Sequence, residues 1–195
     1  LGLAEQTPER KYRPGPAVHV LSAQSLRGSG LLQAALPCLR PLSDENLAIA
    51  LGLVWRTRIC YLIHTPGGRP IEQGIGASLV YPAFLSSIGL AVFSRLANQA
   101  VIELQKTDQP EFNDPTKTAE LIAQLEQTRR QGYALLRPDA PNTSLAVALP
   151  GSLPAGIAFA GHISSPDVPR LADRLQKAAQ AISQELEKRN SPEKK

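Results

Sequence analysis

Residues 47–64 read LAIALGLVWRTRICYLIH, and this stretch decides the fold class. Large apolar residues alternate with small or polar ones in two runs, which is the spacing of a half-buried strand. The break between the runs, Arg56-Thr57-Arg58, is short enough for a tight turn. The two runs therefore predict a β-hairpin, and the sheet that contains it should be mostly antiparallel.

The flanking segments alternate between helical spacing and short apolar runs. Apolar residues three and four positions apart predict helices over 16–27, 30–42, 81–97 and 116–132, and a long final helix opened by residues 164–167. Further strands are expected at 133–136, 144–149 and 155–162, with a strand or loop at 71–80. Pro37 should kink or shorten the second helix. The polar stretch 106–115 should be an exposed connection, and the tail 191–195 should be disordered. We expect an α+β fold.

Composition limits the function classes. The chain has 195 residues, 43% of them hydrophobic, enough for one substantial core. Its formal charge of +4 gathers near the two ends, so the middle of the chain is not a phosphate-binding surface. There is no run of about 18 apolar residues and no signal-peptide pattern, which predicts a cytoplasmic protein. Cys38 and Cys60 lie among apolar neighbours and indicate buried thiols rather than a disulfide. The sequence contains no methionine, so we expect that upstream sequence has been removed.

Motifs for catalysis and metal binding are weak. The segment around Ser86 lacks the first glycine of G-x-S-x-G, and residues 74–79 place Leu79 where a dinucleotide fingerprint has its third glycine. The three histidines, His19, His64 and His162, have no second ligand at helical spacing. We therefore predict no catalytic residue, no metal and no cofactor. A metal site assembled from distant residues stays open.

Four strings resemble the IclR family of bacterial transcription regulators, in the same order along nearly the whole chain. They are GLAEQTPERKYRPGPAVHVL, LLQAALPCLRPL, PAFLSSIGLAVFSRL, and the run from QTRRQGYALL through SLAVAL to AGIAFAG. The first is similar to the wing of a winged helix-turn-helix and its linker helix, with Tyr12, Gly15 and Pro16 in a Y-x-x-G-P pattern. The third is similar to the family's signature helix, with matches at Pro82, Ser86, Gly89 and Ala91.

The resemblance implies an architecture. Residues 1–28 would be the wing remnant and linker helix, with Arg10, Lys11 and Arg13 touching DNA weakly. Residues 29–190 would be an effector-binding domain similar in fold to GAF domains. The recognition helix would lie in an absent N-terminal domain, and exposed Val18 and Leu21 on the linker helix suggest a homodimer or homotetramer.

The resemblance also implies a pocket for a small organic effector. Carried over position by position, it points to Tyr81, Phe84, Ser86, Ser87, Ile88, Asn142, Ser144, Ala158 and Ala160. Where the family often has polar residues, this chain has Phe84, Leu90, Ala158 and Ala160, which favours an aromatic or apolar acid. Either Arg137 or an amide at a helix start would meet its anionic group; Arg137 is equally well read as a solvated loop residue.

Two other function classes stay open. A small-molecule enzyme on a GAF-like scaffold would show a titratable polar cluster in the pocket. An interaction module would have a closed pocket, filled by side chains such as Tyr81, Phe84 and Phe159.

Overall fold

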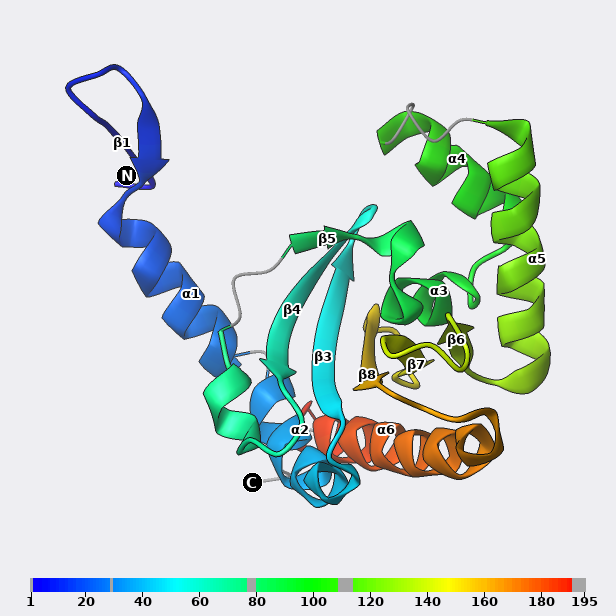
Figure 1. The fold of residues 1–195 in the computed structure, drawn as a ribbon. Coiled ribbons are helices and arrows are strands. Elements are labelled where there is room, and N and C mark those ends of the chain that lie inside the picture. The colour runs from blue at the N-terminus through cyan, green and yellow to red at the C-terminus, as the bar shows by residue number, and fades with distance from the viewer. Residues whose placement is uncertain (1, 29, 77–79, 109–113, 191–195) are drawn as a thin grey trace.

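The computed structural model describes residues 2–28, 30–76, 80–108 and 114–190 (Figure 1). The strands are β1 (Ala4–Gln6), β2 (Tyr12–Pro14), β3 (Ala48–Trp55), β4 (Arg58–Thr65), β5 (Val80–Pro82), β6 (Ala134–Leu136), β7 (Thr143–Ala148) and β8 (Ala155–Gly161). The α-helices are α1 (Pro16–Gly28), α2 (Leu31–Leu39), α3 (Ser87–Phe93), α4 (Asn98–Asp108), α5 (Pro115–Gln131) and α6 (Val168–Asn190). Short 3₁₀ helices are η1 (Arg40–Glu45), η2 (Ile71–Gly74), η3 (Ala83–Leu85) and η5 (Ser165–Asp167). The tail 191–195, residues 77–79 of the predicted strand or loop, and residues 109–113 of the predicted connection lie outside the described residues.

One antiparallel sheet organises the fold. Its strand order is β5-β4-β3-β8-β7-β6, and each neighbouring pair is antiparallel. The hairpin predicted at 47–64 is confirmed as β3–β4, which turns through Arg56 and Thr57. A register shift between Leu51 and Gly52 places one extra residue, Leu62, in β4. The α+β class and the antiparallel sheet predicted from the sequence are therefore confirmed.

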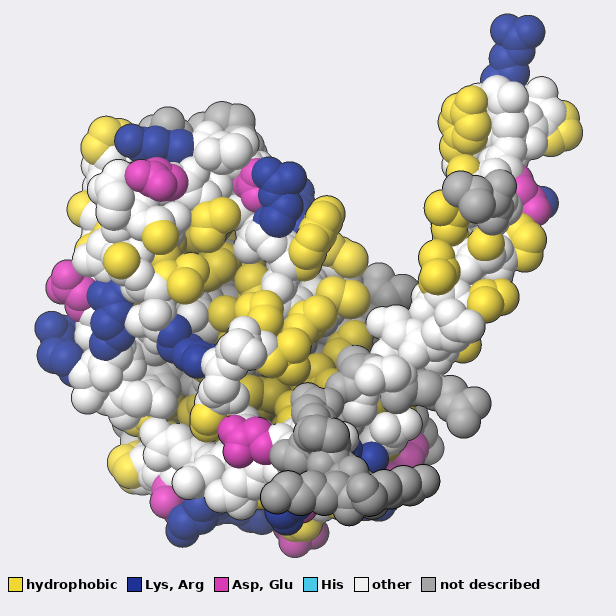
Figure 2. All heavy atoms as spheres, turned by 180° about the vertical axis from the view of Figure 1, so that it is seen from behind, with side chains coloured by type: hydrophobic (Ala, Val, Ile, Leu, Met, Phe, Trp, Pro, Cys, Tyr) yellow, Lys and Arg dark blue, Asp and Glu magenta, His cyan; other side chains and the backbone are white. Residues whose placement is uncertain are grey.

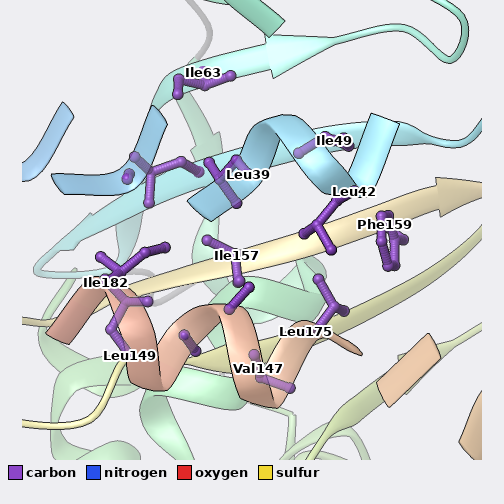
Figure 3. Packing of buried hydrophobic residues seen from close by; sticks show 14 of the residues in the cluster. Leu39, Leu42, Ile49, Ile63, Val147, Leu149, Ile157, Phe159, Leu175 and Ile182 are labelled. Carbon is purple, nitrogen blue, oxygen red and sulfur yellow. The ribbon is translucent and has the colours of Figure 1, made fainter. Parts of the chain in front are cut away.

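The two faces of the sheet differ in side-chain size. One face carries large residues such as Ile49, Ile157 and Phe159, which pack against α2 and α6 (Figure 3). The other face carries alanines in register across four strands: Ala50, Ala158, Ala146 and Ala134. Side chains of α3, α4 and α5 complete the core on this second face. Small residues leave room for α3 to lie directly on the sheet.

Glycines bring α3 close to its neighbours. A Cβ added to Gly89 would collide with the backbone carbonyl of Ala83 in η3. A Cβ added to Gly156 on β8 would lie 2.9 Å from a methyl carbon of Ile88. The position of α3 is thus fixed by backbone contact on one side and by a side chain fitted over a glycine on the other.

An arm precedes the body of the molecule. The β1–β2 hairpin and α1 project away from the sheet and its helices, as Figure 1 shows. The helix predicted over 16–27 is confirmed as α1, which begins at Pro16 as expected for proline in a first helical turn. Hydrophobic side chains are visible along the arm in Figure 2, and Val20 and Leu21 are each more than half exposed.

Some predictions of local structure were wrong. The helix predicted over 81–97 is reduced to α3, because Pro82 disfavours helical backbone at Tyr81 and this segment pairs with β4 instead. Residues 106–108 belong to α4 rather than to a connection. Cys60 is exposed and not buried, because Ile59 and Tyr61 face α3 and turn it to the other face. Pro37 lies inside α2, which ends at Leu39 and continues as η1, so the predicted shortening is confirmed.

Candidate functional site

A cavity of about 520 Å³ opens beside the start of α3. Its floor is formed by the ends of β3 and β8, at Ala48 and Ala160, which pair directly in the sheet. One wall comes from β4 and β5, and the opposite wall comes from β7, the end of β6 and the loop between them. The volume lies in the range typical of small-molecule sites. On the face opposite to that of Figure 1, hydrophobic side chains gather in the middle of the body (Figure 2).

Most of the residues named from the sequence reach this cavity. Its lining includes Tyr81, Ser86, Ser87, Arg137, Asn142, Ser144 and Ala160. These residues come from four separate parts of the fold: β5, the segment from η3 into α3, the β6–β7 loop with the start of β7, and the end of β8. The antiparallel sheet and α3 bring them together.

Three named residues do not reach the cavity. Phe84 stacks on Phe93 with ring centroids 4.8 Å apart and belongs to the core under α3. Ile88 is 1% exposed and points at the glycines of the sheet. Ala158 lies on the same strand face as Ala160, but it is 4% exposed within that core. The cavity begins only beyond the N-terminal end of α3, and the sequence did not reveal where this boundary lies.

The structure adds lining residues that had not been assigned to the pocket from the sequence. They are Ala48, Tyr61, His64, Val80, Leu85, Leu136, Pro141 and Gly161. Tyr61 and His64 are three residues apart on β4, and strict alternation would send them to opposite faces. The extra residue Leu62 restores them to one face, since Tyr61 pairs with Gly52 and His64 with Ala50. Tyr61 and His64 could both have been predicted as lining residues only if this β-bulge had been known.

Hydroxyl groups tie the start of α3 to two strands. The Ser86 Oγ lies 3.3 Å from the Tyr61 hydroxyl, and the Ser87 Oγ lies 2.5 Å from the Ser144 Oγ. Ser86 occupies the N-cap position of α3, but its side chain makes no cap hydrogen bond. Burial raises the pKa of Tyr61 above its usual value, while the hydrogen bond with Ser86 acts in the opposite direction. Tyr61 is therefore a neutral phenol at physiological pH.

The β6–β7 loop presents the cavity's cation. Arg137 adopts a φ of 51°, and its carbonyl accepts a hydrogen bond from the hydroxyl of Thr143 at 2.7 Å. The Arg137 side chain forms no hydrogen bond or ion pair with another described residue. The described lining of the cavity contains no Asp or Glu. A ligand carrying negative charge would therefore meet one guanidinium and no opposing carboxylate.

No protein-family model and no curated protein sequence matches the chain. Solved structures do match. The Thermotoga maritima IclR aligns with a TM-score of 0.70 at 18% identity, over 95% of this chain and 80% of that one. An IclR homolog from Microbacterium hydrocarbonoxydans, complexed with 4-hydroxybenzoate, aligns with a TM-score of 0.68 at 21% identity, over 96% and 80%. The C-terminal domain of the Escherichia coli transcriptional regulator KdgR aligns with a TM-score of 0.63 at 19% identity, over 80% of this chain and 98% of that domain.

The chain has the fold of the IclR regulators. Within this IclR fold, the basic residues predicted to touch DNA lie on the β1–β2 hairpin, at the end of the projecting arm (Figure 1). Arg13 donates to Glu5 at 2.9 and 3.0 Å, so its charge is already partnered. Arg10 and Lys11 are exposed and form no ion pair with another described residue.

Across residues 2–28, 30–76, 80–108 and 114–190, no three His, Cys, Asp or Glu residues gather closely enough to hold an ion. None of the helices described is both long enough and apolar enough to span a bilayer.

Proposed function

We propose that this chain is the ligand-sensing part of an IclR-type transcription regulator and that its cavity binds a small organic acid with an aromatic or apolar body. The observation that carries this proposal is the cavity itself: about 520 Å³ of space, with one unpartnered cation and no acidic side chain in its described lining. The IclR homolog complexed with 4-hydroxybenzoate supports this chemical class for the ligand.

The ligand's carboxylate binds at the β6–β7 loop. Arg137 offers two parallel N–H donors, and Asn142 adds a side-chain amide from the same loop. The helix start is the other anion site considered from the sequence, but α3 has only seven residues, so we assign the charge to Arg137. The apolar part of the ligand then lies over Ala48 and Ala160. The small floor residues provide the space, and Leu136 provides an apolar wall.

Operator contact belongs to a winged-helix domain N-terminal to the hairpin, with Arg10 and Lys11 as additional phosphate contacts. We place the boundary between arm and sensing domain at residues 28 and 29. The ligand changes DNA affinity by binding two arrangements of a homodimer unequally, and such a regulator acts in the cytoplasm. The pocket is not filled by Tyr81, Phe84 or Phe159, since the first lines the cavity and the others lie in the two cores.

A thermal-shift screen tests the proposal. Benzoate, 4-hydroxybenzoate, short keto acids and sugar acids would each be added at millimolar concentration. A ligand present at 100 times its Kd stabilises the fold by about 2.7 kcal/mol, which raises the Tm of a chain this long by roughly 5–10 °C. If no organic acid raises the Tm, the cavity is not a sensing site and the proposal fails.

Calorimetry then tests the role of Arg137 with the strongest acid. Arg137→Ala should weaken binding about tenfold or more, because a charge-assisted hydrogen bond is lost. Arg130→Ala removes an exposed arginine from α5, outside the cavity, and is the matched control. Equal affinity in Arg137→Ala and Arg130→Ala would place the carboxylate elsewhere.

A further inference from the structure

The cavity has two chemically different ends. At the loop between β6 and β7, Arg137 and Asn142 present only N–H donors and an amide oxygen. At the opposite wall, β4 and β5 present the phenols Tyr61 and Tyr81 and the imidazole of His64. A ligand with a single carboxylate would use the first end only. The polar side chains at the second end would then have no partner on the ligand.

His64 reaches the cavity because of the β-bulge in β4. Without the extra residue Leu62, a side chain at position 64 would lie on the opposite face of the sheet from Tyr61. Bulges of this kind redirect a side chain and are over-represented beside functional sites. The ring of His64 meets the ring of Tyr61 edge to face, with centroids 5.6 Å apart, which fixes its orientation.

The imidazole of His64 has unused hydrogen-bonding capacity. Neither of its nitrogens forms a hydrogen bond or ion pair with another described residue. The neighbouring Tyr61 hydroxyl, in contrast, is engaged with Ser86. A half-buried imidazole covered by an apolar ligand would lose its contact with water and gain nothing in return. A ligand that hydrogen-bonds to His64 avoids this cost.

The width of the sheet sets the length of such a ligand. β4 and β6 are separated by β3, β8 and β7, which places their backbones roughly 19 Å apart along the sheet. His64 and Arg137 line the cavity from these opposite walls. A ligand that reaches both side chains therefore needs a polar group at each end of a rigid body such as one aromatic ring.

We infer that the ligand is a two-ended molecule, a para-substituted aromatic acid or one of equal length, whose second polar group is bound by His64. This inference rests on the proposed sensing function and adds a specificity residue to it. Arg137 binds the carboxylate, and His64 selects acids that carry a hydroxyl or a second carboxylate opposite. Acids of the same size that end in a methyl group leave His64 unpaired and bind more weakly.

The test compares 4-hydroxybenzoate with 4-methylbenzoate by calorimetry on the full chain. The two acids are close in size and differ in the polar group at the far end. Wild-type protein should bind 4-hydroxybenzoate about tenfold more tightly. His64→Phe keeps a ring against Tyr61 and should abolish this preference, while the affinity for 4-methylbenzoate stays the same or rises. His64→Gln keeps a hydrogen-bonding group and should retain part of the preference.

His19→Phe makes the same exchange on α1, outside the cavity, and should leave both affinities unchanged. A preference that survives in His64→Phe overturns the role of His64, and so does a wild-type protein that binds both acids equally. If neither these two acids nor any other organic acid binds, the sensing function itself has failed. The two failures are therefore distinguishable.

Discussion

The Asp139 carboxylate accepts hydrogen bonds from the backbone N–H and the hydroxyl of Ser165, at 2.7 and 2.5 Å. Asp139 belongs to the loop that carries Arg137, and Ser165 begins η5, which leads directly into α6. The cavity wall and the last helix are thus joined by a pair of polar contacts. Because α6 packs against α2, and α2 follows the arm, this contact connects the candidate site to the arm through two packed helices.

A variant without the charge of Asp139 should lose less folding stability than the wild type when the pH is lowered into the acid range. The hydrogen bond from the Ser165 hydroxyl, followed by that from its backbone N–H, lowers the pKa of Asp139 below its usual 3.8. A lowered folded-state pKa means that the charged form stabilises the fold above the ordinary pKa, and this contribution is lost as the pH falls through the lowered value. Asp139→Asn is the appropriate change, because asparagine tolerates the φ of 57° found here.

Urea denaturation checks this prediction. The midpoint of Asp139→Asn should be lower than that of the wild type at pH 7, and the two midpoints should converge as the pH falls through the lowered pKa of Asp139. Asp44→Asn changes an exposed carboxylate on η1 and should shift the midpoint little at either pH. A constant difference between Asp139→Asn and the wild type at both pH values would show that charge is not the cause.

Much of the fold follows from local patterns in the sequence. The β3–β4 hairpin is set by alternation, and α5 by its apolar stripe and by Gly132, which ends the helix at a φ of 79°. The sequence does not show where pairing with a distant strand overrides a local pattern. The segment around Tyr81 has helical spacing, yet it pairs with β4, because an edge strand gains hydrogen bonds there.

The candidate site shows the same limit. Ser86, Ser144 and Ala160 line the cavity because they lie where elements end, and turn residues mark such places in the sequence. Ala158 and Ala160 are the same residue type on the same strand face. Ala158 lies in the core and Ala160 lines the cavity only because α3 is too short to cover both. His64 depends on the bulge at Leu62, which has no marker in the sequence.

That difference between Ala158 and Ala160 gives a second prediction. Ala160→Leu places a larger side chain in open space, so folding should be nearly unaffected while the cavity is filled. Ala158→Leu places the same side chain under α3, where it should destabilise the fold by about 1–3 kcal/mol or more. The two variants share strand, face and substitution, and each is the control of the other.

Chemical denaturation and a thermal-shift assay with 4-hydroxybenzoate separate the two effects. Ala160→Leu should keep a wild-type midpoint and lose the shift in Tm. Ala158→Leu should have a lower midpoint, with any shift in Tm retained. Equal loss of stability in both variants would mean that the floor at Ala160 is not open.

The third prediction concerns Gly89, where α3 packs closely against η3. Gly89→Ala forces a methyl group against the Ala83 carbonyl, which is backbone and has no rotamer through which it could move aside. We expect a loss of more than 2 kcal/mol in the free energy of unfolding, although alanine is the better helix former. Ser86 and Ser87 would shift together with the helix, so ligand-induced stabilisation should also decrease.

Gly28→Ala is the matched control for this change. Gly28 is the last residue of α1, and an added Cβ meets nothing within 4 Å. This variant should be neutral or stabilised by up to about 1 kcal/mol. If Gly89→Ala were as stable as Gly28→Ala, the close approach of α3 to η3 would not constrain the fold.

The fourth prediction concerns the arm. Val18, which is half-buried, and Leu21 are three residues apart on α1 and so share one face of a helix that projects from the body of the molecule. Leu21 is 53% exposed, and we predict that a second copy of the chain covers this large apolar residue. Leu21→Ser should therefore weaken self-association, with the Kd of the dimer rising at least tenfold, since burial of one leucine contributes about 1.5–3 kcal/mol.

Sedimentation velocity over a range of protein concentrations measures this effect. Gln24→Ser, an exposed polar position on the same helix, should leave the dimer unchanged. The body of the molecule, including the cavity, should be unaffected by either variant, because α1 lies outside both core clusters. A wild-type chain that sediments as a monomer at every concentration would show that α1 alone does not hold two copies together.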